Sequence, residues 1–224
     1  MKSVESKTYR NKGNMAVLRH VPESAKAILD VGCGAGDNAR ILAHPDRIVD
    51  GVTLSESERE EAMPHCRHVV IHDLENGLPP ELTGPYDCVI CSHVLEHICW
   101  PEKLLKDIHK RLTPDGIIVV ALPNLLFYRS RWNILRGRFR YEESGLMDNT
   151  HFRWYSYRCA QELLSGAGYA VLSAQADGSF PIPYVRKWLP SILVRVVDRA
   201  ACYAFPGMFG YQMVFTAKAD RKYV

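Results

Sequence analysis

The chain has 224 residues, of which 47% are hydrophobic, 10% aromatic and 24% charged. This composition is typical of a single folded globular domain and excludes a disordered or fibrous protein. The net charge of +3 is too small to indicate a nucleic-acid-binding protein.

The first half of the chain alternates short apolar runs with segments of helical pattern. The apolar runs predict strands at residues 27–31, 47–53, 68–71, 86–91 and 117–122. Helices are predicted at residues 36–44, 55–63 and 102–112, and residues 114–116 predict a turn. This order is typical of an α/β fold with a doubly wound, Rossmann-like sheet of mostly parallel strands. The ligand site of such a fold lies at the carboxyl ends of the strands.

The pattern changes after Pro123, where the segments between strands become longer. The remaining predictions are helices at residues 125–136, 156–167 and 184–203, loops at residues 137–151 and 177–183, and strands at residues 169–174 and 211–217. We expect the last strand to insert antiparallel into the sheet. The whole chain, residues 1–224, is therefore predicted to be one domain. Within it, residues 124–155 and 177–208 are expected to be insertions that cover the ligand site as a lid, on the side where an acceptor substrate enters.

The strongest motif is the sequence Asp-Val-Gly-Cys-Gly-Ala-Gly at residues 30–36, which follows a predicted strand and opens a predicted helix. Glycines permit a sharp turn and let a ligand approach the backbone. Residues 34–39 also fit the glycine spacing of a dinucleotide-binding loop, but Asp37 would then lie beside a doubly charged pyrophosphate. S-adenosylmethionine (SAM) carries no phosphate, and the carboxylate of Asp30 suits its ammonium group.

The glycine motif resembles motif I of the class I SAM-dependent methyltransferases, and further motifs of this family follow in order within residues 25–175. Residues 72–75 resemble the adenine-binding segment, residues 86–97 the fourth-strand motif, and residues 112–116 the turn before the fifth strand. Asp115 departs mildly from the family, which usually has glycine there. The resemblance includes small bacterial type-11 and type-12 methyltransferases associated with the modification of cell-surface polysaccharides or small molecules.

The resemblance implies that the cofactor is SAM and that its product is S-adenosylhomocysteine. The residues implied to bind the cofactor are Asp30, Gly32, Cys33, Gly34, Gly36, Thr53, Leu54, Asp73, Leu74 and Ser92. Asp73 would accept a hydrogen bond from the adenine amino group. Thr53 stands where many members carry an acid that binds the ribose, so the resemblance implies a later polar residue, Glu58, as its partner in that role.

Two histidines are candidates for catalysis. A hydroxyl acceptor loses its proton as it attacks the methyl group, and the pKa of histidine suits the removal of that proton. His97 follows the fourth predicted strand, and His151 lies in residues 148–156, a segment that resembles one found in the small bacterial methyltransferases. His151 is the preferred base or acceptor-orienting group. The alternative for both histidines is that they brace the adjacent loops.

The cysteines predict neither a metal site nor a disulfide framework. Cys88 and Cys91 have the spacing of zinc ligands, but residues three apart in a strand point to opposite faces of the sheet. We therefore expect no bound metal. The seven cysteines are irregularly spaced, which favours reduced thiols and a cytoplasmic protein.

The predicted reaction is methyl transfer to a hydroxyl of a small-molecule or glycan-type acceptor. An arginine-rich segment is predicted to bind an anionic acceptor or, alternatively, to be a solvated helix face; its members are Arg129, Arg131, Arg136, Arg138 and Arg140. N- or C-methylation, a lipid or quinone acceptor, and a non-catalytic SAM-binding partner subunit remain alternatives, whereas a nucleic-acid acceptor is disfavoured. The amphipathic helix 184–203 is predicted to cover the pocket, with a homodimer contact or peripheral contact with the inner face of a membrane as alternatives.

Overall fold

The computed structural model describes residues 12–181 and 185–220 of the chain. At its centre lies a seven-stranded sheet in the order β3-β2-β1-β4-β5-β7-β6. The strands are β1 (Ala27–Val31), β2 (Ile48–Thr53), β3 (His68–Ile71), β4 (Tyr86–Ser92), β5 (Leu112–Pro123), β6 (Tyr169–Gly178) and β7 (Gly210–Ala219). The first five strands pair in parallel, whereas β7 lies antiparallel between β5 and β6. The predicted doubly wound α/β fold with an antiparallel C-terminal strand is confirmed.

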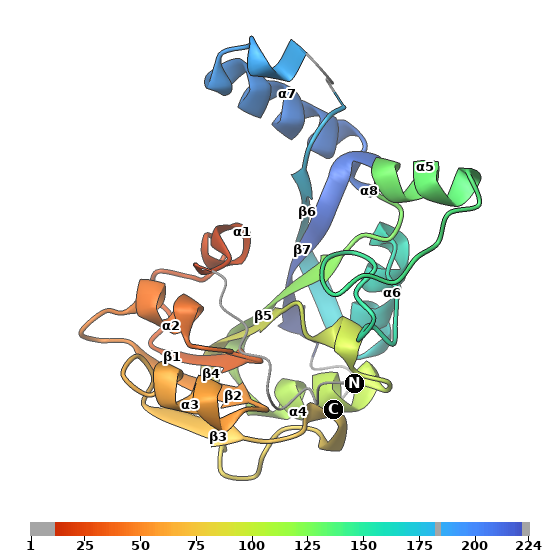
Figure 1. The fold of residues 1–224 in the computed structure, drawn as a ribbon. Helices are drawn as coiled ribbons and strands as arrows, with labels where there is room; N and C mark the ends of the chain where they lie inside the picture. The colour runs from red at the N-terminus through yellow and green to blue at the C-terminus, as the bar shows by residue number, and fades with distance from the viewer. Residues whose placement is uncertain (1–11, 182–184, 221–224) are drawn as a thin grey trace.

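Helices are arranged around the sheet in Figure 1. The α-helices are α1 (Met15–Leu18), α2 (Asp37–Leu42), α3 (Glu56–Ala62), α4 (Pro101–Arg111), α5 (Tyr128–Leu135), α6 (Tyr157–Gly166), α7 (Ser191–Ala204) and α8 (Pro206–Phe209). The short 3₁₀ helices are η2 (Leu74–Asn76), η3 (Leu95–His97) and η4 (Val185–Lys187). Val17 of α1 and Leu42 of α2 belong to one buried cluster, and Leu105 of α4 and Leu164 of α6 belong to another. These two clusters form the core on opposite faces of the sheet.

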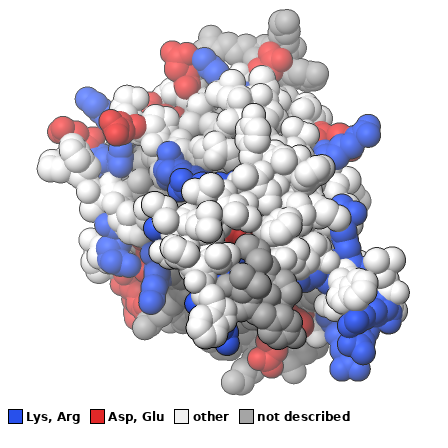
Figure 2. Space-filling model, turned by 90° about the horizontal axis from the view of Figure 1, so that it is seen from above, with Lys and Arg blue, Asp and Glu red and all other residues white. Residues whose placement is uncertain are grey.

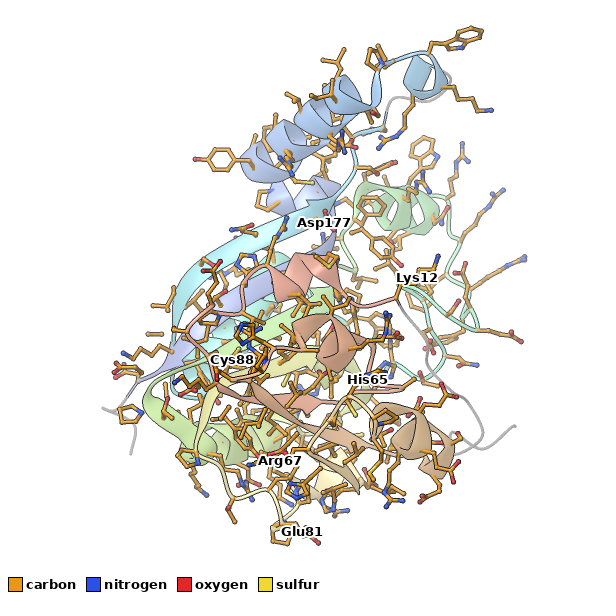
Figure 3. The ribbon with its side chains drawn as sticks, turned by 90° about the vertical axis from the view of Figure 1, so that its left-hand side faces the viewer. Lys12, His65, Arg67, Glu81, Cys88 and Asp177 are labelled. Carbon is orange, nitrogen blue, oxygen red and sulfur yellow. The ribbon has the colours of Figure 1, made fainter. Side chains whose placement is uncertain are left out.

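The side chains of the central strands alternate between the two clusters, as successive residues of a strand do. In β1, Ile28 belongs to the cluster with α1 and α2, whereas Leu29 belongs to the cluster with α4 and α6. Cys88 and Cys91 are divided in the same way, so their thiols point to opposite faces as predicted; Cys88 is labelled within the sheet in Figure 3. The two thiols therefore pack as small apolar groups.

Helix α5 begins at Tyr128 rather than at residue 125 because the side chain of Asn124 holds the preceding segment in a turn. The side-chain oxygen of Asn124 accepts a hydrogen bond from the Leu126 N–H at 3.0 Å. Its amide donates to the backbone carbonyls of Gly207 and Gly210 at 3.1 and 2.8 Å. These bonds connect the residue after β5 to α8 and the start of β7, and they keep residues 124–127 out of helix α5.

Two predicted turn or loop segments belong to strands instead. Residues 114–116, predicted as a turn, lie within β5, and the pairing of β5 with β4 accommodates them by a shift of register. The first two residues of the predicted loop 177–183 lie inside β6, because pairing with β7 continues through Asp177, opposite Gln212, to Gly178, opposite Gly210. Long-range strand pairing therefore overrides the local turn pattern at both places.

The predicted amphipathic helix 184–203 is divided in two. Its first residue belongs to residues 182–184, which lie outside the described residues. The remainder forms η4 and α7, and Pro190 stands at the N-cap of α7. Helix α7 projects beyond the main body of the domain in Figure 1. Within the described ranges, none of the helices has the length and apolar character needed to cross a bilayer.

Candidate functional site

The glycine loop joins β1 to α2 in a conformation that requires glycine. Gly32, Gly34 and Gly36 have φ angles of +72°, +52° and +79°, in the left-handed region where other residues are strained. A Cβ on Gly32 would also lie 2.6 Å from Cγ2 of Val94, and one on Gly36 would lie 2.8 Å from Cα of Ala62. The loop therefore depends on glycine both for its turn and for its packing.

Asp30 stands in β1 immediately before this loop and is 1% exposed. Neither of its carboxylate oxygens has a partner at normal hydrogen-bond geometry among the described residues, although the Asn38 side chain lies close enough to act on the carboxylate. Burial raises the pKa of Asp30 to about 7, and the neighbouring Asn38 side chain offsets this effect only in part. Because an unpartnered buried carboxylate is costly, a cationic group of a ligand would stabilise the protein at this position.

The end of β2 carries a buried pair of polar residues. The Thr53 hydroxyl donates a hydrogen bond to Oε2 of Glu58, which comes from the first turn of α3. Cys33 of the glycine loop packs at Gly51 of β2, where a Cβ would lie 2.6 Å from the Cys33 sulfur. Burial raises the pKa of the Cys33 thiol, so the thiol stays protonated. Leu54, which follows β2, is exposed. Thr53 and Glu58 thus form one hydrogen-bonded unit beside the loop.

The segment after β3 is a turn that holds its own shape. Asp73 caps η2, and its Oδ1 accepts a hydrogen bond from the Glu75 N–H at 3.0 Å. Leu74 is buried, whereas Asp73 is exposed. The side chain of Glu75 accepts a hydrogen bond from the Cys99 N–H at 2.7 Å, which links η2 to the segment before α4. The residues predicted to bind adenine therefore lie on a fixed turn.

A hydrogen-bond network that the sequence did not reveal lies at the end of β4. The side-chain amide of Asn14 donates to Oγ of Ser92 at 3.0 Å and to Oε1 of Gln212 at 3.1 Å. The same Gln212 oxygen lies 2.9 Å from Nε2 of His93, and the Gln212 amide donates to Asp177 at 3.2 Å. Asp177, labelled in Figure 3, comes from β6 close to α7. The network connects the segment before α1 with β4, β6 and β7.

His93 lies at the centre of this network and has a φ of +57°, which is uncommon for a residue with a side chain. Its Nδ1 lies 3.2 Å from Oε1 of Glu96. Because its partners on both sides are acceptor oxygens, both ring nitrogens donate, as in the cationic imidazolium. Burial lowers the pKa of His93, but the hydrogen bond and charge of Glu96, together with Gln212, outweigh burial and raise the pKa. The raised pKa favours the protonated form of His93, which makes it a poor base.

The two predicted catalytic histidines lie side by side. The ring centroids of His97 and His151 are 4.8 Å apart in an edge-to-face arrangement. Glu96 is fully buried beside them, and its Oε2 has no hydrogen-bond partner among the residues described; the same is true of Nδ1 of His151. Burial lowers the pKa of His151, although the charge of Glu96 opposes this effect. The His151 ring is therefore neutral near pH 7.

The loop before α6 fixes this cluster in place. Nδ1 of His97 lies 3.2 Å from the Thr150 carbonyl oxygen and 3.1 Å from the Thr150 hydroxyl. Oδ1 of Asp148 accepts hydrogen bonds from the N–H and the hydroxyl of Thr150 at 2.8 and 2.6 Å. The backbone N–H of Phe152 donates to the Glu96 carbonyl at 2.9 Å. This polar segment therefore docks onto η3.

The structure brings the predicted site residues to one edge of the sheet. The residues predicted to bind the cofactor belong to, or directly follow, β1, β2, β3 and β4, which run parallel. His97 and His151 meet just beyond β4. Sequence reasoning missed Asn14 and Gln212. In the sequence, Asn14 could be recognised only as a residue type that favours a helix N-cap, and Gln212 only as a polar residue within a predicted strand.

Comparisons with known proteins give independent information about the family of this chain. A family model described as "Methyltransferase domain" matches residues 7–174. A ubiquinone biosynthesis O-methyltransferase from Chromobacterium violaceum is 29% identical over 118 residues, covering 47% of this chain and 48% of the relative. Another from Caulobacter sp. (strain K31) is 32% identical over 111 residues, covering 46% of this chain and 43% of the relative. The chain spans about half the length of the curated relatives it matches.

Solved structures share the fold. A SAM-dependent methyltransferase from Archaeoglobus fulgidus matches with a TM-score of 0.63 at 19% identity, over 91% of each chain. A magnesium protoporphyrin IX methyltransferase from Synechocystis PCC 6803 with bound SAH matches with a TM-score of 0.52 at 16% identity, over 85% of this chain and 72% of that one. The unpartnered carboxylate of Asp30 and the loop that only glycine can form fit the ammonium and methionyl parts of SAM. The chain belongs to the class I SAM-dependent methyltransferases.

Proposed function

We propose that this enzyme transfers the methyl group of SAM to a hydroxyl oxygen of a small-molecule acceptor. The observation that carries the proposal is the cluster of buried Glu96, half-buried His97 and buried His151 just beyond β4. A hydroxyl loses its proton as its oxygen attacks the methyl carbon, and histidine and carboxylate side chains assist that loss. The names of the curated relatives, which are O-methyltransferases, also support oxygen as the acceptor atom.

The proposal includes a binding mode for the cofactor. Asp30 pairs with the ammonium group, and Thr53 with its partner Glu58 faces the ribose. The remaining proposed contacts are Gly32, Cys33, Gly34 and Gly36 with the methionyl part, Leu54 with the ribose side, Asp73 and Leu74 with adenine, and Ser92 near the sulfonium. When bound, SAM supplies an activated methyl group, and its sulfur keeps the electron pair of the broken C–S bond. The chain itself contributes position and charge.

A groove between β6 and α7 supports an acceptor route from that side. Its volume is about 830 Å³, and Arg19, Arg195 and Arg199 are among the residues that line it. Asp177 also lines the groove and accepts the hydrogen bond of Gln212, which connects the groove to the network around His93. We propose that the predicted insertions, residues 124–155 and 177–208, form the acceptor side of the site.

A phenolic acceptor of the quinone type is the first candidate, since the curated relatives are named for ubiquinone biosynthesis. A glycan-type or anionic acceptor is the second. It is supported by a smaller groove of about 300 Å³ beside α5, which Arg138 and Arg140 line. Other arginines of that segment have local roles, since Arg136 stacks 4.3 Å over the ring of Trp132 and Arg131 donates to a backbone carbonyl.

We further propose that α7 makes peripheral contact with an anionic membrane surface, from which an apolar acceptor would enter the groove. The exposed apolar side chains of this region are Trp188, Ile192, Leu193, Val196, Tyr203 and Phe205. Trp188 is 87% exposed, and the basic residues Lys187 and Arg195 belong to the same η4–α7 segment. Figure 2 views the molecule from this side and shows a broad uncharged surface with basic and acidic side chains around its margins. A helix with an apolar face and basic flanks suits such an interface.

An acceptor screen with methyl-labelled SAM tests the reaction. We expect transfer to hydroxylated phenols, and we expect His151→Phe to abolish it while the variant still binds SAM. Transfer only to nitrogen or carbon acceptors, or unchanged transfer by His151→Phe, would contradict the proposal. Absence of turnover with every acceptor would favour the partner-subunit alternative.

Vesicle flotation tests the membrane contact. The wild-type chain is expected to float with vesicles that contain phosphatidylglycerol, and Val196→Asp is expected to remain in solution. Binding that is equal for both chains, or a homodimer in light scattering that Val196→Asp dissociates, would overturn the membrane assignment. The same variant should retain SAM binding, which shows that it folds.

A further inference from the structure

We propose that Glu96, His97 and His151 form a binding site for a first-row divalent metal ion such as Zn²⁺. One ligand atom from each residue can be chosen so that all three lie within 4.8 Å of one another. Zinc holds nitrogen and oxygen ligands at about 2.0–2.2 Å, which places them roughly 3.5 Å apart. Movements of about 1 Å would therefore close the site. The proposal departs from the sequence-based expectation that no metal is bound.

Two unpartnered atoms at this place point to a ligand. Oε2 of Glu96 and Nδ1 of His151 are buried, and neither has a hydrogen-bond partner in the described part of the chain. The two residues are 0% and 8% exposed, so water does not satisfy these atoms freely. A buried polar atom without a partner typically costs about 1–3 kcal/mol. Shared coordination of one cation would satisfy both atoms at once.

The surrounding contacts prepare His97 to bind an ion. The Thr150 carbonyl can only accept a hydrogen bond, so Nδ1 of His97, at 3.2 Å, carries the proton. The remaining nitrogen, Nε2, then presents its lone pair. Asp148 fixes Thr150 in turn, through hydrogen bonds to its N–H and its hydroxyl. An outer partner that sets the histidine tautomer in this way is typical of metal sites.

Glu96 is held in a similar manner. Its Oε1 faces Nδ1 of His93 at 3.2 Å, which leaves Oε2 directed elsewhere. Its backbone carbonyl accepts from the N–H groups of Phe152 and Arg153 at 2.9 and 3.1 Å, so the loop that carries His151 is tied to η3. Two imidazoles and one carboxylate with open coordination positions suit Zn²⁺, Fe²⁺, Co²⁺ or Mn²⁺ better than Mg²⁺ or Ca²⁺.

The chemical role of the ion rests on the proposed hydroxyl acceptor. An open position on the ion would take the acceptor oxygen and lower the pKa of its hydroxyl, so that the proton leaves to solvent before or during attack. The oxygen then bonds to the methyl carbon, the C–S bond breaks, and the sulfur keeps the electron pair. The binding of the ion itself does not depend on this acceptor.

The test uses the full chain without an affinity tag, freed of metal by a chelator and titrated with Co²⁺ alone. We expect about one equivalent to bind with visible d–d absorption, and Zn²⁺ to displace it. Glu96→Gln and His97→Ala should lose the spectrum, and Thr150→Val should weaken binding by about 10–100-fold. His65→Gln is the matched control, because His65, labelled in Figure 3, is exposed and outside the cluster.

SAM-induced thermal stabilisation, measured on each variant, shows that it folds. Retained stabilisation with loss of the cobalt spectrum supports the site. No Co²⁺ binding by the wild-type chain, or binding that is equal in Glu96→Gln, His97→Ala and His65→Gln, would overturn it. Because no acceptor is present in this titration, a wrong acceptor assignment would leave the result unchanged.

Discussion

Replacing Asp30 by Asn is expected to stabilise the protein without cofactor and to weaken its binding of SAM. The pKa of Asp30 is raised by burial to about 7 from 3.8, so the folded state holds this proton more tightly than the unfolded chain does. Below pH 3.8 the carboxyl group is protonated in both states and costs no stability. As the pH rises from 3.8 through 7, the unfolded chain loses this proton first, so the stability of the folded state falls. One pKa unit corresponds to about 1.4 kcal/mol, so the full cost is about 4 kcal/mol.

Calorimetric unfolding without cofactor measures this cost. Between pH 5 and pH 8, the stability of the wild-type chain relative to Asp30→Asn should fall by about 2–3 kcal/mol. For a chain of this size, 1 kcal/mol changes Tm by about 2–4 °C, so the Tm advantage of the variant should grow by about 5–10 °C. Asp46→Asn, at an exposed acid before β2, is the control and should show no such dependence.

Bound SAM should stabilise the wild-type chain more than Asp30→Asn, the opposite of the order of stability without cofactor. A charge-assisted hydrogen bond contributes about 1.5–3 kcal/mol, so Asp30→Asn should bind SAM about 10–100-fold more weakly in titration calorimetry at pH 8. Equal SAM affinity of the variant and the wild-type chain would contradict the proposed role of Asp30. A Tm difference between the two chains that is the same at pH 5 and pH 8 would contradict the proposed cost of its burial.

Three further substitutions test other parts of the account. Gly36→Val should abolish SAM-induced thermal stabilisation, because φ is +79° and the new Cβ would meet the backbone of Ala62 at 2.8 Å; retained stabilisation would count against the loop. Asn14→Ala removes the bonds to the ends of β4 and β7 and should lower kcat by about tenfold, a cost of about 1.4 kcal/mol; unchanged kinetics would show that the network is only structural. Tyr86→Phe removes a buried hydrogen bond of 2.9 Å to Asp50 and should cost about 1 kcal/mol in urea unfolding; no change would show that the bond adds no net stability.

The central fold was predictable because its signals are local. Each of the first five strands contains a short apolar run, and the glycine motif at residues 30–36 marks where β1 turns into α2. The errors lie where distant contacts decide. The start of α5 depends on Asn124 binding carbonyls of Gly207 and Gly210, and the end of β6 depends on its pairing with β7.

The sequence also indicated where the candidate site lies, whereas the roles of its residues stay predictions. The cofactor motif could be recognised because its residues are contiguous, and His97 and His151 stood out within polar segments. Their contact, at 4.8 Å between ring centroids, depends on the docking of the loop before α6 onto η3, which no short-range pattern encodes. Asn14 and Gln212 are far apart in sequence and meet only in the folded sheet.

The most direct test of the account is to determine the atom that receives the methyl group. The enzyme would be incubated with SAM carrying a ¹³C-labelled methyl group and a dihydroxylated phenol, and the product examined by NMR. We expect a methyl ether formed together with S-adenosylhomocysteine, and no ether from His151→Phe although that variant binds SAM. A methyl group on carbon or nitrogen, or an ether formed equally by His151→Phe, would contradict it.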